Sequence, residues 1–343
     1  KGIELVNKIA MPTLVVLGIA LMIRVLTLGA PDPAHPDWNV VNGLGFMWNP
    51  DFSRLGDPKV WLAAAGQIFF TLSVGIGVIL SYASYLKPKD DVALSALSSS
   101  SMNEFLEVVI AGSIVIPAAV IFYGPVQAVE IAKSGSFNLG FVTMPLIFTR
   151  MPAGNFFCFL WFILLFLAAL TSSISILQPS ISFLEDEFRF NRKRSVLISG
   201  AVCFIFSQFV IFGITKGFLD EMDFWGGTYL LVLFGLIEVL YFGWVFGIDK
   251  AWEELKKGAD IKIPGFFKYV IKYVTPAYIL IMLATFTWQN FRGFILMESY
   301  GKNWGERLPV LLLRIILLLF FLFICFVIHI AWKRNERSKE ASS

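Results

Sequence analysis

The sequence is poor in charge and in the side chains from which catalytic and metal sites are usually built. Only 15% of its 343 residues are charged, whereas soluble globular proteins have about 25%. It contains two histidines and three cysteines without a CxxC spacing, so a Cys/His metal site is not indicated. HExxH and GxSxG motifs are absent, as is any nucleic-acid-binding signature. Neither an enzyme nor a nucleic-acid-binding protein is therefore favoured.

Long apolar runs dominate the chain instead. Hydrophobic residues make up 57% of it, and the mean hydropathy is +0.73. Several runs exceed the ~18 residues that a helix needs to cross the hydrocarbon core of a bilayer. We predict an all-α integral membrane protein with one helical domain over residues 1–343. Eight spans are expected, at about 8–29, 62–86, 94–123, 153–185, 196–215, 225–247, 267–290 and 308–332.

The loops between these spans differ in charge. Lys and Arg concentrate at the two ends and in alternate loops, with 18 of the 28 on one side and 8 on the other. Because cytoplasmic loops carry the excess of Lys and Arg, both ends of the chain are predicted to be cytoplasmic, in the plasma (inner) membrane. The sequence starts at Lys1 without Met and shows no signal peptide, and we interpret it as a fragment.

Two long loops, 30–57 and 124–152, fall on the predicted external side. The second is expected to form two short helices, one on either side of Gly140. Long ordered loops often act as lids, although plain connections are the alternative.

One expected span is weakened at its centre. The stretch Gly66–Tyr85 reads GQIFFTLSVGIGVILSYASY and carries Thr71, Ser73, Gly75 and Gly77 in its middle. In lipid, a helix can unwind only where protein or a cavity receives its backbone groups, and such discontinuous helices are typical of secondary transporters. The alternative is a small-residue packing face, but the glycines are two apart rather than four. We predict a break near residues 73–77.

Other polar side chains occur where lipid would make them costly. Glu107 lies within an apolar run and Asn103 is four residues earlier, so the two share a helix face. They point either to a polar site or, alternatively, to capping or interfacial groups near the helix start. Further along, the hydroxyls of residues 171–173 are hard oxygen ligands of the kind that a small cation prefers. The alternative for them is hydrogen bonding to carbonyls of their own helix.

Four segments together resemble one known family. GQIFFTLSVGIGVILSYASY, SSMNEFLEVVIAGS, ALTSSISILQP followed by FLEDE, and LDEMDFWGGT occur in this order. They are similar to the neurotransmitter:sodium symporter family, in its bacterial hydrophobic-amino-acid branch. The resemblance runs from Lys1 into the last span.

The resemblance implies the LeuT-type fold, in which twelve spans are expected and the first ten form two inverted five-helix repeats. This chain would begin at the fifth span, with the first four missing. Residues 1–29 would be the last helix of repeat one, 58–247 would be repeat two, and 263–334 would form two peripheral helices.

The resemblance also assigns residues to a shared substrate and sodium (Na⁺) site. The substrate pocket would be lined by Phe70, Thr71, Ser73, Ile76, Ser172 and Ile176. One sodium ion would be bound by Thr71 and Asn103. A second would be bound by the carbonyl of Ala168 and the hydroxyls of Thr171 and Ser172. The cytoplasmic gate would comprise Tyr85 and Asp186, and the external gate Phe137 and Asp223.

Two positions bear on specificity. Glu107, close to Gln67, would stand where chloride-dependent members carry Ser, which implies chloride-independent transport and leaves open the return of a proton on Glu107. Ile76 stands where a leucine-transporting relative has Phe, so the pocket wall is apolar but differently shaped.

These observations lead to the expectation of a sodium-coupled importer of a small apolar L-amino acid that works by alternating access. The alternatives are a channel-like or non-transporting membrane subunit of the same fold, and a proton-coupled amino-acid transporter. Expected partners are the substrate, sodium ions, the lipid bilayer and a second copy of the chain, bound through the C-terminal helices.

Overall fold

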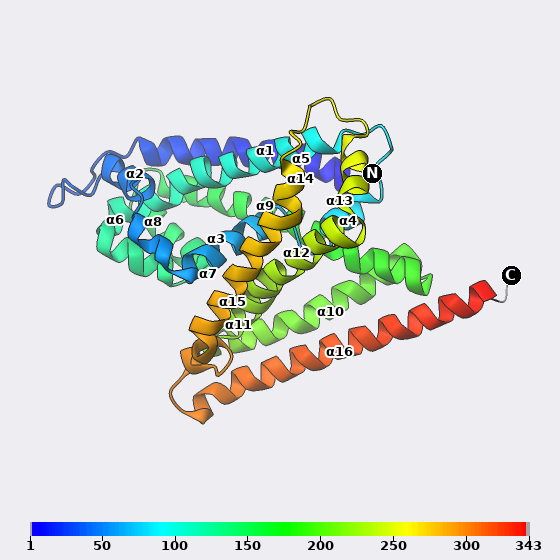
Figure 1. The fold of residues 1–343 in the computed structure, drawn as a ribbon. Helices are drawn as coiled ribbons and strands as arrows, with labels where there is room; N and C mark the ends of the chain where they lie inside the picture. The colour runs from blue at the N-terminus through cyan, green and yellow to red at the C-terminus, as the bar shows by residue number, and fades with distance from the viewer. Residues whose placement is uncertain (1, 341–343) are drawn as a thin grey trace. The chain divides into compact units, whose positions relative to one another are not determined.

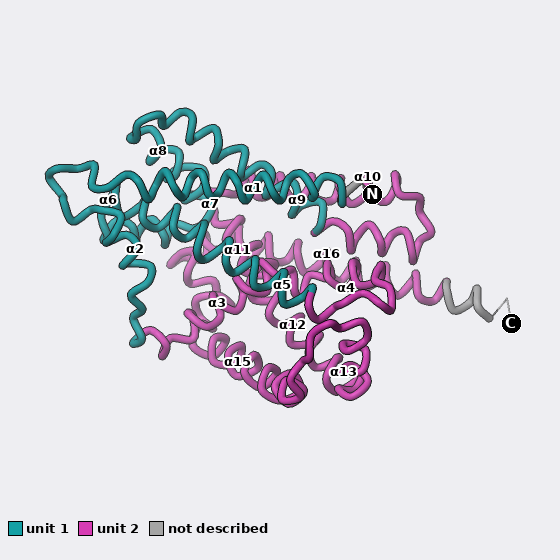
Figure 2. Tube along the Cα trace, turned by 90° about the horizontal axis from the view of Figure 1, so that it is seen from above, with its two compact units in different colours: residues 1–53, 95–175 teal, residues 54–94, 176–343 magenta. Residues whose placement is uncertain are grey.

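The computed structural model describes residues 2–340, and this part of the chain contains helices and no strands (Figure 1). Lys1, where the resemblance begins, lies outside the described residues, as do residues 341–343. The chain divides into two compact units, each built from two separate segments (Figure 2). Unit 1 comprises residues 1–53 and 95–175, and unit 2 comprises residues 54–94 and 176–343.

Seven helices in the described part are long and apolar enough to cross a membrane. They overlap seven of the eight expected spans and run over Glu4–Leu26, Val92–Lys133, Gly154–Phe188, Arg192–Lys216, Phe218–Val245, Phe267–Phe294 and Trp304–Arg334. The remaining expected span, 62–86, is interrupted. Its first part is α3 (Pro58–Thr71) and its last part is α4 (Val78–Ala83), which confirms the predicted discontinuous helix.

Unit 1 is held together by an apolar core around Leu21, Ile114, Ile121 and Phe148. Its helices are α1 (Gly2–Leu26), α2 (Val40–Trp48), most of α5 (Val92–Glu104), the π-helix η2 (Phe105–Ala111), α6 (Gly112–Lys133), α7 (Ser136–Asn138), the π-helix η3 (Leu139–Thr143), α8 (Met144–Thr149) and most of α9 (Gly154–Phe188). The short 3₁₀ helix η1 (Phe52–Gly56) leads from unit 1 into unit 2.

The expectation of two helices on either side of Gly140 is wrong. Gly140 lies inside the continuous helical stretch Ser136–Thr149, where its carbonyl accepts a hydrogen bond from Trp161 Nε1 at 2.9 Å. The chain turns instead at Gly124 (φ 75°) and Gly135 (φ 88°). At Gly124 a side chain would also collide with the Trp38 ring. A helix can absorb an internal glycine at a cost of about 1 kcal/mol, and sequence alone did not show which glycines need a positive φ.

Unit 2 has its core where α3 packs against α12 and α15, around Leu62, Val232, Leu236, Ile279 and Phe286. Its other helices follow in chain order: α10 (Arg192–Gly213), η4 (Ile214–Lys216), α11 (Phe218–Asp223), the π-helix η5 (Phe224–Tyr229), α12 (Leu230–Leu240), the π-helix η6 (Tyr241–Val245), α13 (Ile248–Lys256), α14 (Phe267–Tyr269), the π-helix η7 (Val270–Val274), α15 (Thr275–Phe294), η8 (Glu298–Tyr300) and α16 (Trp304–Glu340).

The loop that follows α4 is tied to the loop after α13. Asp91 Oδ2 accepts the backbone N–H of Asp260 at 2.6 Å, and its Oδ1 accepts that of Leu94 at 2.8 Å. These two bonds, of which the bond from Asp260 has the larger effect, lower the pKa of Asp91. Both bonds favour the ionised carboxylate of Asp91. The contact between the two loops is therefore present at neutral pH and is lost only as the pH falls through the lowered pKa of Asp91.

Candidate substrate and ion site

The break between α3 and α4 is a run of left-handed backbone conformations. Ser73 (φ 58°), Gly75 (φ 76°) and Gly77 (φ 80°) all have positive φ, which a regular helix does not allow. A left-handed residue other than glycine costs roughly 1–2 kcal/mol, so the structure around Ser73 must hold it in place. Helical hydrogen bonding therefore stops in the middle of a span, at the position that the sequence predicted.

Contact with α12 fixes the break in place. A Cβ atom at Gly75 would lie 2.5 Å from the carbonyl oxygen of Leu231 and 3.2 Å from the backbone nitrogen of Gly235. These are backbone atoms that cannot rotate away, so only glycine fits here. The lack of a side chain at Gly75 lets the unwound segment approach the backbone of α12 closely, and a Cβ at Gly235 would collide with the ring of Phe69 on α3.

Glu238 is a residue of this region that the sequence analysis missed. Its Oε2 accepts the backbone N–H of Gly75 at 3.3 Å. This N–H belongs to the unwound segment and has no helical partner, so the carboxylate supplies the hydrogen bond that the break removes. The signal was present in the sequence, because a single carboxylate in the apolar run 230–242 is costly in lipid.

Four of the predicted substrate residues lie at or within a few residues of this break. Phe70 and Thr71 end α3, while Ser73 and Ile76 belong to the unwound segment. Thr71 Oγ1 donates to the carbonyl of Ile68 at 3.3 Å, and Gln67 lies one turn earlier on α3. The break thus places hydroxyl groups, backbone polar groups and apolar side chains within ten residues of each other.

In unit 1, the structure brings Asn103 and Glu107 together. Asn103 Nδ2 donates to Glu107 Oε2 at 3.4 Å, so the two side chains share a face as their spacing predicted. The helix begins at Val92, which puts Asn103 and Glu107 three to four turns inside it and removes the alternative of capping at its start. Glu107 also lies in the π-helix η2, and single π-helical turns are frequent at functional sites.

The hydroxyls of α9 bond to their own helix. Thr171 Oγ1 donates to the carbonyls of Leu167 at 2.9 Å and Ala168 at 3.1 Å, and Ser173 Oγ donates to Leu170. The same contacts place the Thr171 hydroxyl and the Ala168 carbonyl, two of the predicted sodium ligands, beside each other. A hydroxyl keeps acceptor capacity while it donates, so two oxygens 3.1 Å apart remain suited to one small cation.

The two remaining α9 residues of the predicted site are exposed. Ser172 follows Thr171, and Ile176 lies one turn further on with an exposed fraction of 39%. Because they are four residues apart, the polar and the apolar side chain lie on the same face of α9.

The predicted gate residues lie at the ends of helices. Tyr85 and Asp186 are exposed, and no hydrogen bond joins them among the residues with described side chains. Phe137 stacks on Phe141 with ring centroids 4.9 Å apart. Asp223 is the last residue of α11, and its Oδ1 would be 2.8 Å from a Cβ at Gly227, so the carboxylate lies over that glycine.

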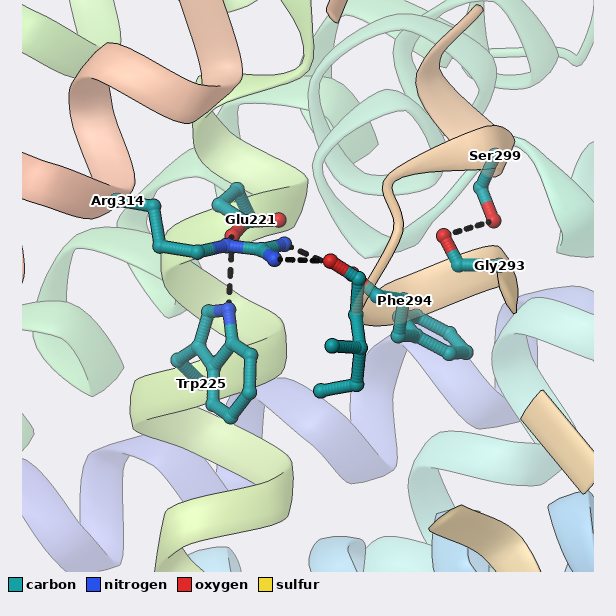
Figure 3. Close-up of polar contacts among 7 residues, drawn as sticks. Glu221, Trp225, Gly293, Phe294, Ser299 and Arg314 are labelled. Atoms are coloured by element: carbon teal, nitrogen blue, oxygen red, sulfur yellow. Dashed lines mark hydrogen bonds and ion pairs between the residues drawn. The ribbon is translucent and has the colours of Figure 1, made fainter. Parts of the chain in front are cut away.

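A buried ion pair, two residues before Asp223 in the sequence, links α11 to α16 (Figure 3). Glu221 is fully buried, and its Oε1 accepts from Arg314 Nε at 2.6 Å and from Trp225 Nε1 at 2.7 Å. Arg314 also donates to the carbonyls of Phe294 at 2.9 Å and Ile295 at 3.0 Å. One arginine of α16 therefore balances the charge of Glu221 and caps the C-terminal end of α15.

The loop between α15 and α16 completes this cluster. Ser299 Oγ donates to the carbonyl of Gly293 at 3.0 Å. Burial first, and then the negative charge of Glu221, raises the pKa of the Tyr300 phenol above its ordinary range.

Three features described above are typical of a secondary transporter. They are the glycine-containing break in the middle of a span, the contact that holds the unwound segment against α12, and the carboxylates within membrane spans. A model of the sodium:neurotransmitter symporter family matches residues 1–335, and the chain belongs to this family. The family assignment agrees with the resemblance of the four sequence segments.

The relatives include transporters from distant organisms. An uncharacterized sodium-dependent transporter of Methanocaldococcus jannaschii is 32% identical over 80% of this chain and 54% of its own length. A sodium-dependent dopamine transporter of Caenorhabditis elegans is 29% identical over 85% of this chain and 47% of its own length. The chain therefore spans about half the length of the curated relatives that it matches.

A solved structure supports the fold. The crystal structure of MhsT in complex with L-phenylalanine matches with a TM-score of 0.67 and 31% identity, over 83% of this chain and 63% of that chain. The fold is part of the LeuT-type transporter fold, as the sequence analysis expected. MhsT carries its phenylalanine in that structure, which bears on the substrate proposed below.

Proposed function

We propose that the chain forms part of a sodium-coupled symporter that imports a small apolar L-amino acid by alternating access. The helix break at 72–77 carries this proposal, because it interrupts helical hydrogen bonding in the middle of a span, beside the hydroxyls of Thr71 and Ser73. Such groups can bind the charged ends of an amino acid together with a small cation. The sodium-dependent relatives support coupling to Na⁺.

An apolar amino acid fits the side chains of the predicted pocket. Phe70, Ile76 and Ile176 are apolar, whereas Ser73 and Ser172 supply the polar end. The presence of L-phenylalanine in the related MhsT structure supports the same class of substrate. Because Ile76 is smaller than Phe, this wall leaves more room for the substrate side chain.

Sodium can drive such import against a steep gradient. One charge that moves inward across a potential of about −100 mV releases ~2.3 kcal/mol, which is more than a tenfold concentration ratio. We propose two ion sites, one at Thr71 and Asn103 and one at Ala168, Thr171 and Ser172. Sodium and substrate would then favour each other's binding, because coupling between two sites is reciprocal.

The proposed arrangement in the membrane follows the charges of the loops. Residues 1–29 would end repeat one, 58–247 would form repeat two, and 263–334 the two peripheral helices, with both ends in the cytoplasm. Tyr85 and Asp186 would then gate the inner side, and Phe137 and Asp223 the outer side. The lipid-exposed α16 is proposed as part of a homodimer interface.

Substitution of Asn103 tests the sodium site. Asn103→Ala in the full-length protein is expected to weaken sodium-dependent amino-acid binding about 10–100-fold, because it removes a polar contact to a charged group. Binding of labelled Leu, Ala, Met and Trp to liposome-reconstituted protein, with and without sodium, measures the effect. Asn42→Ala, on α2, serves as the control with unchanged binding. Sodium-independent binding in the wild type would overturn the proposal and favour a proton-coupled or non-transporting relative.

Glu107 is proposed to replace chloride as the fixed negative charge beside the sodium ions, with Gln67 close to it. Glu107→Ser is therefore expected to make uptake depend on chloride, with a drop of about tenfold or more when gluconate replaces chloride. Uptake of the best substrate in the two buffers gives the ratio. Glu104→Ser, on the same helix, should leave uptake independent of chloride. The idea fails if Glu107→Ser transports equally well in both buffers.

A further inference from the structure

An open groove with a volume of about 900 Å³ lies between α12 and α15, beside η5. Both helices belong to membrane spans, and all the residues that line the groove are in unit 2. Several side chains along α15 are turned outward, with exposed fractions of 58% for Leu280 and 87% for Trp288. Apolar side chains that point outward from a membrane span are suited to contact with lipid acyl chains.

The groove changes in character from one end to the other. Leu236, Leu280 and Leu283 line the inner end and contribute no polar atoms from their side chains. Thr287, Gln289 and Arg292 line the outer end, where Tyr229 Oη and Thr287 Oγ1 also form a hydrogen bond of 2.7 Å. An occupant must therefore be apolar over most of its length and polar at one end.

The charge of the groove lining indicates which polar group an occupant must carry. Arg292 is the one charged residue of the lining, and no acidic side chain takes part in it. Arg292 is exposed and has no hydrogen bond or ion pair with any other side chain that the structure describes. An arginine fork that lacks a partner is suited to a phosphate group, which it can bind through two parallel hydrogen bonds.

The length of the groove fits one leaflet of a bilayer. Twelve residues of α15 separate Leu280 from Arg292, which is about 18 Å at 1.5 Å per residue. Half of the hydrocarbon core is about 15 Å thick, so the arginine reaches the level of the headgroups. Trp288 lies one turn before Arg292 on the same face, and Trp is enriched at that level.

We propose that this groove binds a phospholipid with a net negative headgroup. One acyl chain lies along α15 from Trp288 to Leu280, and the headgroup phosphate pairs with Arg292. This lipid would touch both α15 and η5, the π-helix that directly follows the proposed gate residue Asp223. The proposal concerns the membrane face and does not depend on which solute is transported.

Quenching of Trp fluorescence by lipids with brominated acyl chains tests the proposal, because bromine quenches only on contact. The full-length protein is placed in phosphatidylcholine bilayers, into which brominated phosphatidylglycerol or brominated phosphatidylcholine is titrated. The difference between the wild type and Trp288→Phe isolates the signal of Trp288 from that of the other tryptophans. Phosphatidylglycerol is expected to associate about fivefold more strongly, which is the preference that one basic residue near the surface supplies.

The variants separate a headgroup site from general attraction. Arg292→Gln is expected to reduce the fivefold preference to nearly none, whereas Lys302→Gln, which removes a positive charge ten residues further along, should retain it. In the wild type alone, salt near 1 M should also remove the preference, because the Debye length falls to about 3 Å. The proposal is overturned if Arg292→Gln keeps the preference. It is equally overturned if neither lipid quenches Trp288, since another part of the protein or a second copy would then fill the groove.

Discussion

Gly75→Ala is expected to lower sodium-dependent uptake by the full-length protein about 100-fold or more. The added methyl group would lie 2.5 Å from the carbonyl oxygen of Leu231 and 3.2 Å from the nitrogen of Gly235. The break would have to move away from α12, because overpacking against a fixed backbone adds about 1–3 kcal/mol to the 1–2 kcal/mol that the left-handed conformation costs. The same movement would lengthen the hydrogen bond from Gly75 N–H to Glu238.

Gly77→Ala is the matched control for this experiment. Gly77 has nearly the same positive φ, but a Cβ there would come no closer than 3.7 Å to any atom, the nearest being in Pro179. Only the conformational cost remains, so uptake should fall on the order of tenfold. Initial rates in liposomes, normalised to the amount of folded protein, give the comparison. Equal losses in the two variants would show that contact with α12 is not what holds the site.

Loss of Arg314 is expected to destabilise the protein by about 3–5 kcal/mol, the usual effect of removing one partner of a buried ion pair. Arg314→Met would leave the fully buried Glu221 carboxylate with a hydrogen bond from Trp225 but without a countercharge. It would also uncap the carbonyls of Phe294 and Ile295. Reversible unfolding in mixed micelles, followed by circular dichroism, would measure the change.

Two further variants define the cause of that loss. The exposed pair of Lys133 and Glu130, 2.7 Å apart, should contribute no more than about 1 kcal/mol, so Lys133→Met is the control. Replacement of both partners, as in Glu221→Leu with Arg314→Leu, should recover much of the stability because no charge stays buried. If the double variant is as unstable as Arg314→Met, the capped carbonyls rather than the charge would account for the loss.

The ion pair also bears on the proposed outer gate. Asp223 lies two residues after Glu221 and ends the same short helix. If Asp223 moves during closure, it must therefore either carry the C-terminal end of α15 and the Arg314 region of α16 with it or break contacts to Arg314. The stability measurements above and a parallel measurement of uptake in the same variants would separate these roles.

Much of the fold was readable from the sequence because its cause is local. A run of 18 or more apolar residues forms a helix in lipid whatever its neighbours are, since every backbone group must be satisfied within the helix. For the same reason, glycines and a serine in mid-span at 73–77 predicted the break. The pair Asn103 and Glu107 followed from spacing alone. The roles assigned to the substrate, sodium and gate residues rest on the resemblance and stay predictions.

What the sequence determined by itself is the all-helical membrane fold, the position of the break and the family. The tertiary structure decided which distant groups meet. Glu238 bonds to Gly75 from 163 residues away, and Arg314 reaches Glu221 across 93. It also decided that Gly124 and Gly135, rather than Gly140, turn the segment 124–152. These features depend on how closely two packed helices approach each other and on which residue pairs with a buried charge. Neither of these two factors leaves a periodic pattern in the sequence.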